Sequence, residues 1–242
     1  FLDELPEFGR AALEALRQPL EDGEVSLVRA RDRATMPARF MLLGAMNPCP
    51  CGHSSDANPS RCHCTLPARE NYRRRISGPI LDRFDLHIEV NPLRSGELLA
   101  APGGETSAAV RARVERAREI QRERFRELPG VYCNAQLSGP RLRELCHATP
   151  GALERLARAI DSTHLSARAH DRILKLARTV ADLRGNERVT HEEIDEASQL
   201  RCLDRPLTAQ PNTRQGPLAI ARKVAAHAVP GASPGELPRE GT

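Results

Sequence analysis

Residues 40–52 read FMLLGAMNPCPCG, and this stretch decides the fold class that the sequence predicts. An unbroken apolar run of strand length, here from Phe40 to Met46, is typical of a strand covered on both faces in a parallel sheet. Asn47 and Pro48 end the run, and an Asn-Pro pair is also an ordinary turn that closes a strand. We therefore expect a buried strand that belongs to an α/β layer.

The chain opens on Phe-Leu-Asp-Glu, which reads as the last steps of a second buried strand entered midway, so we expect a truncated chain. Asp3 and Glu4 then lie at the carboxyl end of a strand, the edge at which open α/β sheets place their ligands. In nucleoside triphosphatases one such carboxylate holds Mg²⁺ and its neighbour accepts a proton from the attacking water. Taken alone, the pair is more simply explained as a solvated strand end.

Short elements surround these strands. Residues 7–18 place apolar side chains on one face of a helix. Residues 25–30 and 35–39 are β-prone pieces on either side of a basic tip, so we expect a hairpin. Residues 84–90 alternate apolar and polar positions and predict a returning strand, after which residues 92–104 read as a linker.

The second half of the chain has helical periodicity. The predicted helices cover residues 107–128, 139–147, 150–161 and 166–184. A last helix begins at a capping box formed by Thr190 and Glu193. Residues 206–242 are rich in Pro, Gly, Ala and Thr and predict a flexible tail. An α/β layer followed by a helical bundle is the layout of a nucleotide-binding module with a lid.

Composition excludes some classes of function. The 242 residues carry 36 basic and 32 acidic side chains, a net charge of +4, which argues only weakly for nucleic acid. Aromatic residues make up 3% and Trp is absent, which disfavours a protein that binds single strands by base stacking. The longest apolar run is far shorter than the roughly 20 residues that span a bilayer, so membrane residence is not expected.

Four of the seven cysteines form two Cys-x-Cys pairs, Cys49 with Cys51 and Cys62 with Cys64, separated by ten residues. Their segment, residues 47–67, has no apolar pattern that could build a core. Four thiolates suit a structural zinc ion, because four protein ligands leave no open position on the metal for a substrate. His53 or His63 could replace a cysteine, and a reducible disulfide pair or free thiols are the alternatives. This cysteine usage predicts a cytoplasmic protein rather than a secreted disulfide framework.

Five stretches together carry a family resemblance. They are residues 1–8, 16–23, 45–52, 76–85 and 165–174. With them the chain resembles the Mg-chelatase-like AAA+ ATPase family of the YifB or ComM type, which includes competence helicases, and more distantly the Mg-chelatase ATPase subunit and the replicative MCM helicases. The resemblance implies a partial AAA+ core in residues 1–104, with a parallel sheet, flanking helices and a hairpin before sensor 1. It implies an all-α lid domain in residues 105–205.

The same resemblance assigns roles to the carboxylates and the asparagine. Asp3 matches the Walker B residue that holds Mg²⁺, and Glu4 matches the catalytic base. Asn47 matches sensor 1, where an amide can orient water and the γ-phosphate without adding charge. ATP and Mg²⁺ are therefore the expected cofactors, together with Zn²⁺ at the cysteines.

Two arginines receive roles in the same way. Arg83 matches the arginine finger, which enters the site of the neighbouring subunit, and Arg168 matches sensor 2 at the start of a lid helix. A planar guanidinium with fixed charge can follow negative charge as it spreads over phosphoryl oxygens. The alternative is a pair of surface arginines bound to Asp82 or Asp171.

The basic tip of the expected hairpin, Arg29, Arg31 and Arg33, matches a hairpin that points toward DNA in the central pore of helicase relatives. Arginines that contact phosphates would give affinity without reading sequence. A solvated hairpin end is an equally good explanation.

The resemblance implies an ATP hydrolase that forms a hexameric ring with itself and remodels branched or single-stranded DNA, as a branch-migration helicase in natural transformation or recombination. A Gly-x-x-x-x-Gly-Lys-Ser/Thr phosphate loop is absent from these residues, so we expect this chain alone to hydrolyse little ATP. One alternative is a Mg-chelatase ATPase subunit that drives porphyrin metalation. Another is a non-enzymatic, zinc-stabilised DNA-binding module.

Overall fold

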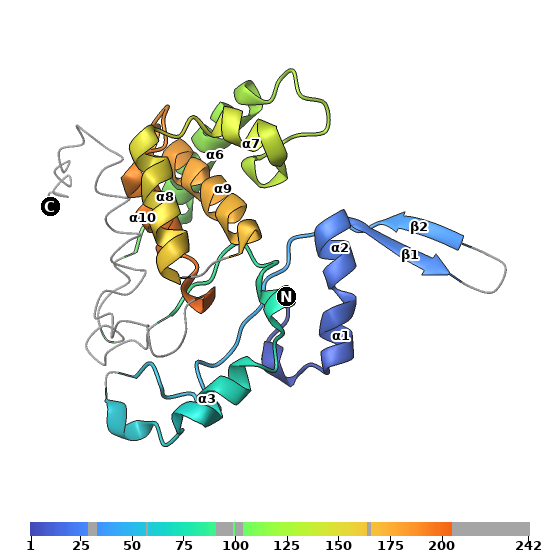
Figure 1. Ribbon diagram of the computed structural model, residues 1–242, viewed down its shortest axis with the longest axis vertical. Helices are drawn as coiled ribbons and strands as arrows, with labels where there is room; N and C mark the ends of the chain where they lie inside the picture. Colours follow the sequence, from blue (N-terminus) through green and yellow to red (C-terminus); the bar gives the residue numbers. More distant parts are fainter. Residues whose placement is uncertain (29–32, 57, 91–98, 100–103, 164–165, 205–242) are drawn as a thin grey trace, which may run out of the picture.

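A computed structural model describes residues 1–28, 33–56, 58–90, 99, 104–163 and 166–204, in an N-terminal part and a helical C-terminal part (Figure 1). The N-terminal part contains η1 (Leu5–Glu7), α1 (Arg10–Ala15), α2 (Arg17–Asp22), β1 (Glu24–Val28), β2 (Arg33–Pro37), η2 (Pro59–Arg61), α3 (Leu66–Arg73) and α4 (Gly78–Leu81). The C-terminal part contains α6 (Ser107–Arg124), η3 (Asn134–Gln136), α7 (Gly139–Cys146), α8 (Pro150–Thr163), α9 (Ala167–Arg184), α10 (His191–Gln199) and η4 (Cys202–Asp204). The predicted tail lies outside the described residues.

A small apolar core holds the N-terminal part together. Leu5, Leu13, Ile76 and Ile80 are each at most 4% exposed and form one cluster. They come from η1, α1, the turn after α3, and α4, so the cluster joins elements that are distant in sequence. Fully burying a side chain of this size stabilises a fold by about 1.5–3 kcal/mol.

The predicted parallel sheet is absent from the described residues, and the expected α/β core is corrected accordingly. Leu2 and Gly44 form only an isolated parallel bridge, in which the amide of Leu2 donates to Leu43 O at 2.8 Å and the amide of Ala45 donates to Leu2 O at 2.8 Å. No second strand pairs with the apolar run there, and Met41 is 91% exposed. A sheet needs hydrogen-bonded neighbours as well as β-prone residues, so the run stays irregular.

The expected strand at residues 84–90 is also reduced to one bridge. His87 pairs in parallel with Arg201, and the amide of His87 donates to Leu200 O at 2.6 Å. Arg201 is buried and donates to Phe84 O at 2.8 Å. The neighbour of this segment is thus the end of the C-terminal part, and these bonds fix the two parts of the molecule against each other.

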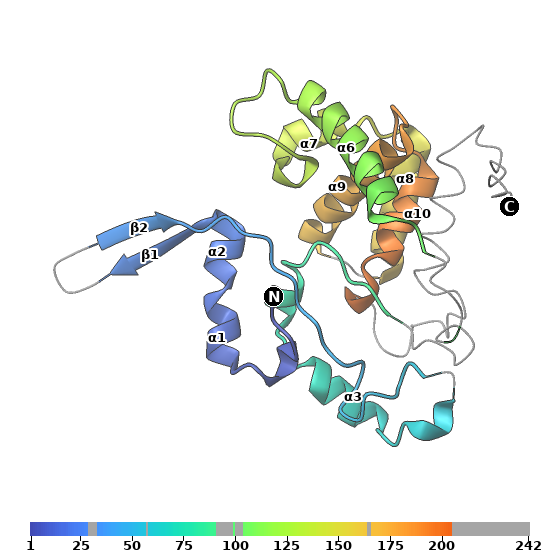
Figure 2. The same ribbon diagram turned by 180° about the vertical axis from the view of Figure 1, so that it is seen from behind.

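The predicted hairpin is confirmed, and it projects from the body of the molecule in both views (Figures 1 and 2). Strands β1 and β2 pair antiparallel, with Glu24 opposite Pro37 and Val28 opposite Arg33. The predicted helix at residues 7–18 is instead two short helices, α1 and α2, that meet at Leu16. Pro19 explains the break, because proline lacks an N–H and is tolerated in the first turn of a helix but not in its interior.

The predicted helical bundle is confirmed, and α9 runs through its centre. Ile173, Leu174, Ala177 and Ala181 of α9 are at most 1% exposed, at the spacing that places residues on one helix face. The predicted capping box at the start of α10 is present. No helix in the described part of the chain combines the length and the apolar character needed to cross a membrane.

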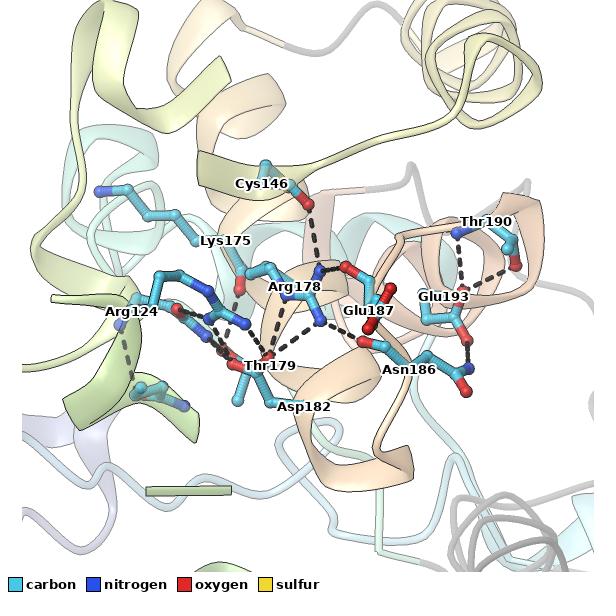
Figure 3. Close-up of polar contacts among 12 residues, drawn as sticks. Arg124, Cys146, Lys175, Arg178, Thr179, Asp182, Asn186, Glu187, Thr190 and Glu193 are labelled. Atoms are coloured by element: carbon cyan, nitrogen blue, oxygen red, sulfur yellow. Dashed lines mark hydrogen bonds and ion pairs between the residues drawn. The ribbon is translucent and has the colours of Figure 1, made fainter. Parts of the chain in front are cut away.

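A buried polar network also links the helices of this bundle (Figure 3). The carboxylate of Asp182 accepts hydrogen bonds from Arg124 at 2.5 and 2.8 Å, from Asn134 at 2.8 Å and from Arg178 at 3.1 Å. The Arg178 guanidinium, which is fully buried, also donates to main-chain carbonyls, including Cys146 O at 3.3 Å. A buried charge is tolerated only when it is paired and hydrogen-bonded, and here each one is.

Candidate nucleotide and metal sites

The backbone places the two candidate carboxylates beside the candidate sensor. Because Leu2 bridges Gly44 and the amide of Leu5 donates to Ala45 O at 2.9 Å, Asp3 and Glu4 lie next to the segment that leads to Asn47. The side chains of all three are exposed. The structure therefore brings these sequence-predicted residues to one edge of the N-terminal part, open to a ligand.

Glu4 has an unusual backbone conformation. Its φ of 50° and ψ of 45° lie in the left-handed region, which is uncommon for a residue other than glycine. The amide of Glu4 donates to Asp3 Oδ1 at 2.9 Å, and the buried Leu5 follows directly, which hold the turn in place. Such strain costs on the order of 1–3 kcal/mol and clusters at functional sites. His147, which ends α7, has the same conformation with a φ of 51°, so the backbone alone does not assign a role to Glu4.

The candidate arginine finger is packed inward. The guanidinium of Arg83, just after α4, donates to Arg17 O at 3.2 Å and to Pro79 O at 2.6 Å, and it forms an ion pair with Glu21. Its side chain is only 6% exposed. Burial lowers the pKa of Arg83, and the nearby positive charges of Arg17, Arg168 and Arg172 lower it further.

The candidate sensor 2 arginine meets the same carboxylate. Arg168, in the first turn of α9, donates to Glu21 Oε1 at 2.9 Å, so two arginines from different parts of the fold share one partner. The alternative, in which these arginines bind Asp82 or Asp171, is not what the structure shows, because both pair with Glu21. Glu21 was not predicted from the sequence, because its partners Arg83 and Arg168 lie 62 and 147 positions further along the chain and no local signal links them to it.

The carboxylates and the arginines form two separate groups in one chain. Among the described residues, no hydrogen bond or ion pair joins Arg83 or Arg168 to Asp3, Glu4 or Asn47. One chain thus presents an acidic edge, formed by Asp3, Glu4 and Asn47, and a separate arginine cluster around Arg83 and Arg168; phosphoryl transfer uses groups of both kinds.

The hairpin tip is only partly described. Arg29 and Arg31 lie outside the described residues. Arg33 is exposed at the start of β2, and Leu27 and Val28 on the opposite strand are 49% and 74% exposed. The described residues beside the tip are therefore accessible to a partner.

The four predicted cysteines converge on one point. Their sulfur atoms all lie within 4.8 Å of one another, and Cys49 lies 3.5 Å from Cys51 and 3.8 Å from Cys62. A disulfide would place two sulfurs about 2.05 Å apart, whereas a tetrahedron with Zn–S bonds of about 2.3 Å has edges near 3.8 Å. The arrangement fits zinc and does not fit a disulfide pair.

The surroundings of the cysteines also suit a metal. Burial raises the pKa of Cys49, but hydrogen bonds from Ser54, Cys51 and Cys62 outweigh it and bring the pKa to about 6. Arg69 of α3 donates to Cys62 Sγ at 3.2 Å, the kind of outer contact that orients a metal ligand. The ring of His53 instead contacts Asp56 at 3.1 Å, and no histidine of the described residues joins the group. The cysteine cluster is therefore a candidate Cys₄ zinc site.

Comparison with known proteins places the chain in a family. The family model for magnesium chelatase, subunit ChlI, matches residues 1–98, and the model for the C-terminal part of the same subunit matches residues 104–201.

Similar individual proteins agree with these two models. Competence protein ComM of Haemophilus influenzae is 44% identical over 209 residues, which cover 86% of this chain and 39% of ComM. The uncharacterized protein YifB of Escherichia coli is 43% identical over 209 residues, covering 86% of this chain and 40% of YifB. An uncharacterized protein of Mycobacterium tuberculosis is 43% identical over 201 residues, covering 83% of this chain and 39% of that protein. The chain spans about two fifths of the length of these relatives. It belongs to the magnesium chelatase ChlI-like ATPase family, with ComM and YifB among its homologues.

Proposed function

We propose that this chain is part of an ATPase whose nucleotide site is shared between two copies. One copy contributes Asp3, Glu4 and Asn47, and the next contributes Arg83 and Arg168. The observation that carries the proposal is the separation of the acidic edge from the arginine cluster, since a site complete within one chain would bring them together. Rings of identical subunits with head-to-tail interfaces place two such surfaces against each other, and we propose a hexamer.

The exposed oxygens on the acidic edge suit a hard cation. Asp3 would hold Mg²⁺, which prefers carboxylate and phosphate oxygens and keeps several waters. Bound Mg²⁺ and ATP would supply the phosphoryl group and neutralise part of its charge. Glu4 then accepts the proton of the attacking water, and Asn47 orients that water through its amide. The arginines stabilise the negative charge that develops on the phosphoryl oxygens.

We propose DNA as the substrate on which the ATPase acts, in the manner of a branch-migration helicase. The support is the projecting hairpin of β1 and β2, together with the exposed Arg33 at the start of β2 and the positions of Arg29 and Arg31 in the sequence between the two strands. Arginines on a projecting hairpin can follow phosphates without reading bases. The zinc at the cysteine cluster is structural in this proposal, because four thiolates complete the coordination of the metal.

The test is ATP hydrolysis by a chain extended to the length of the relatives, so that it carries a phosphate-binding loop, with and without branched DNA. Glu4→Gln and Arg83→Ala are each expected to lose DNA-stimulated hydrolysis. Mixing the two variants is expected to restore part of it, because some interfaces then combine an intact Glu4 with an intact Arg83. Arg111→Ala, which changes an exposed arginine of α6, is the matched control and should retain activity.

Other results would change the proposal in defined ways. No recovery on mixing would contradict a site shared between copies. Hydrolysis that is indifferent to DNA would favour a chelatase-type partner. Absence of hydrolysis in the extended wild-type chain would leave the non-enzymatic DNA-binding module.

A further inference from the structure

Glu21 fills the space between the two arginines that are expected to contact phosphate. Its Oε1 accepts from Arg168 at 2.9 Å, and its Oε2 pairs with Arg83. A guanidinium binds a carboxylate and a phosphate with the same fork of N–H donors. The position of the Glu21 carboxylate is therefore also the position in which an anionic ligand would be bound.

The surrounding charges mark this place as an anion site. Arg17 and Arg172 stand close enough to Arg83 to act on its charge, so four guanidinium groups gather here. The other carboxylates of the cluster have their own partners. Glu14 accepts from Arg17 at 2.9 Å and from Ser77 at 2.6 Å, and Asp85 pairs with Arg172. Removing the charge of Glu21 would leave Arg83 and Arg168 without the carboxylate that pairs with both of them in the described part of the chain.

Glu21 is held there by the arginines and not by its own helix. It lies in the last turn of α2, where the carbonyl end of the helix disfavours a negative charge. Its side chain is 43% exposed and that of Arg168 is 58% exposed, so water can reach the pair. A carboxylate in this setting can be displaced by a competing anion without unfolding the helix.

We propose that Glu21 is the resting occupant of a phosphate site built by Arg83 and Arg168, and that a nucleotide phosphate binds there only when Glu21 leaves. This inference rests on the proposed shared nucleotide site and adds a way in which phosphate binding at that site is regulated. In the resting chain Arg83 is satisfied internally and does not reach outward. Arrival of the phosphate group of the neighbouring copy's nucleotide exchanges one anion for another and turns the arginines toward the shared site.

The test uses this chain alone with pyrophosphate as the probe, measured by isothermal titration calorimetry at low salt. Glu21→Ala is expected to bind pyrophosphate about tenfold more tightly than wild type, because a hydrogen bond to a charged group is worth on the order of that factor. Glu21→Gln, which keeps the shape and loses the charge, should fall between them. Glu14→Gln removes a carboxylate of the same cluster that bonds Arg17 and Ser77 and acts on Arg83 only through its charge, so its gain should be much smaller than that of Glu21→Ala.

A second variant separates a real site from general loosening of the fold. Arg168→Ala in the Glu21→Ala background is expected to remove the gain. Equal affinity in wild type and Glu21→Ala, absence of binding in both, or an equal gain in Glu14→Gln would each overturn the inference. The readout needs no ATP turnover. A gain in pyrophosphate binding together with an inactive extended chain would support the role of Glu21 and count against the proposed function alone.

Discussion

Neutralising Asp182 is expected to destabilise the helical part of the chain strongly. Its carboxylate has no exposed surface and accepts hydrogen bonds from Arg124, Asn134 and Arg178 at 2.5–3.1 Å. In Asp182→Asn an amide faces two guanidinium groups, and one of its two terminal atoms is a donor that cannot accept from them. Removing one partner of a buried ion pair costs about 3–5 kcal/mol, because the other charge stays buried.

A surface pair offers the matched control. Arg155 contacts Asp195 at 2.5 Å, which is as short as the shortest contact of Asp182, but both side chains are about two fifths exposed, at 44% and 39%. Exposed pairs contribute roughly 0–1 kcal/mol. Asp195→Asn should therefore change the free energy of unfolding little, although the chemical change is the same.

The assay is urea unfolding followed by far-ultraviolet circular dichroism, with the free energy of unfolding extrapolated to water. We expect Asp182→Asn to lower it by about 3–5 kcal/mol relative to wild type. A loss no larger than that of Asp195→Asn would refute the reasoning that the network carries the stability of the bundle.

The pH dependence gives a second check on the same residue. Burial by itself raises the pKa of Asp182, but the hydrogen bonds from Arg124 and Asn134 and the charge of Arg178 outweigh it, and the pKa lies below its ordinary value of 3.8. A lowered pKa in the folded state means that the contribution is complete at neutral pH. It is lost as the pH falls below about 4. The difference in the free energy of unfolding between wild type and Asp182→Asn should therefore shrink as the pH falls below about 4.

Three further predictions concern other parts of the chain. Purified under reducing conditions, the chain should bind one zinc ion by elemental analysis, and Cys51→Ser should lose it while Cys133→Ser keeps it; equal zinc contents would contradict a Cys₄ site. Hydrogen bonds from Thr190 and the charge of Arg184 overcome the effect of burial and lower the pKa of Glu193 to about 2. Glu193→Gln should therefore lower the free energy of unfolding by about 1 kcal/mol at neutral pH, and unfolding measured at decreasing pH should show this difference vanishing toward pH 2. Gly44→Ala should lower the thermal midpoint, because its Cβ would lie 3.1 Å from Leu5 Cδ2, and an unchanged midpoint in differential scanning calorimetry would show that this contact yields.

The helical half of the fold was predictable because its signals are local. The capping box of Thr190 and Glu193 and the helix predicted at residues 166–184 depend on residues that are close in sequence, and both appear as expected. The cysteine cluster was predictable for a related reason. Closely spaced pairs of thiols in a segment without a core have few other uses, and the structure favours four cysteines over histidine because His53 turns to Asp56.

The parallel sheet was not predictable in the same way. The apolar run that ends at Met46 has the composition of a buried strand, but a strand forms a sheet only through bonds to neighbours. Within the described residues, its partner is the short segment around Leu2. The composition of a segment indicates its tendency to form a strand, whereas the neighbouring segments decide whether that strand joins a sheet. The buried Arg178 was missed because an arginine on a helix is usually exposed, and nothing in its neighbourhood marks the carbonyls that receive it.

The arginine cluster shows why a role assigned by position needs the fold before it becomes a mechanism. The resemblance supplied Arg83 and Arg168 as separate residues, each with its own task. The bridge between His87 and Arg201 fixes the C-terminal part against the N-terminal part, and the two arginines then meet at one carboxylate. While the guanidinium of Arg83 donates to groups of its own chain, it cannot also stabilise the charge on a phosphate bound to a neighbouring copy. If Arg83 acts on a nucleotide, some event must therefore free it, and the exposed Glu21 is the contact that an incoming phosphate can replace.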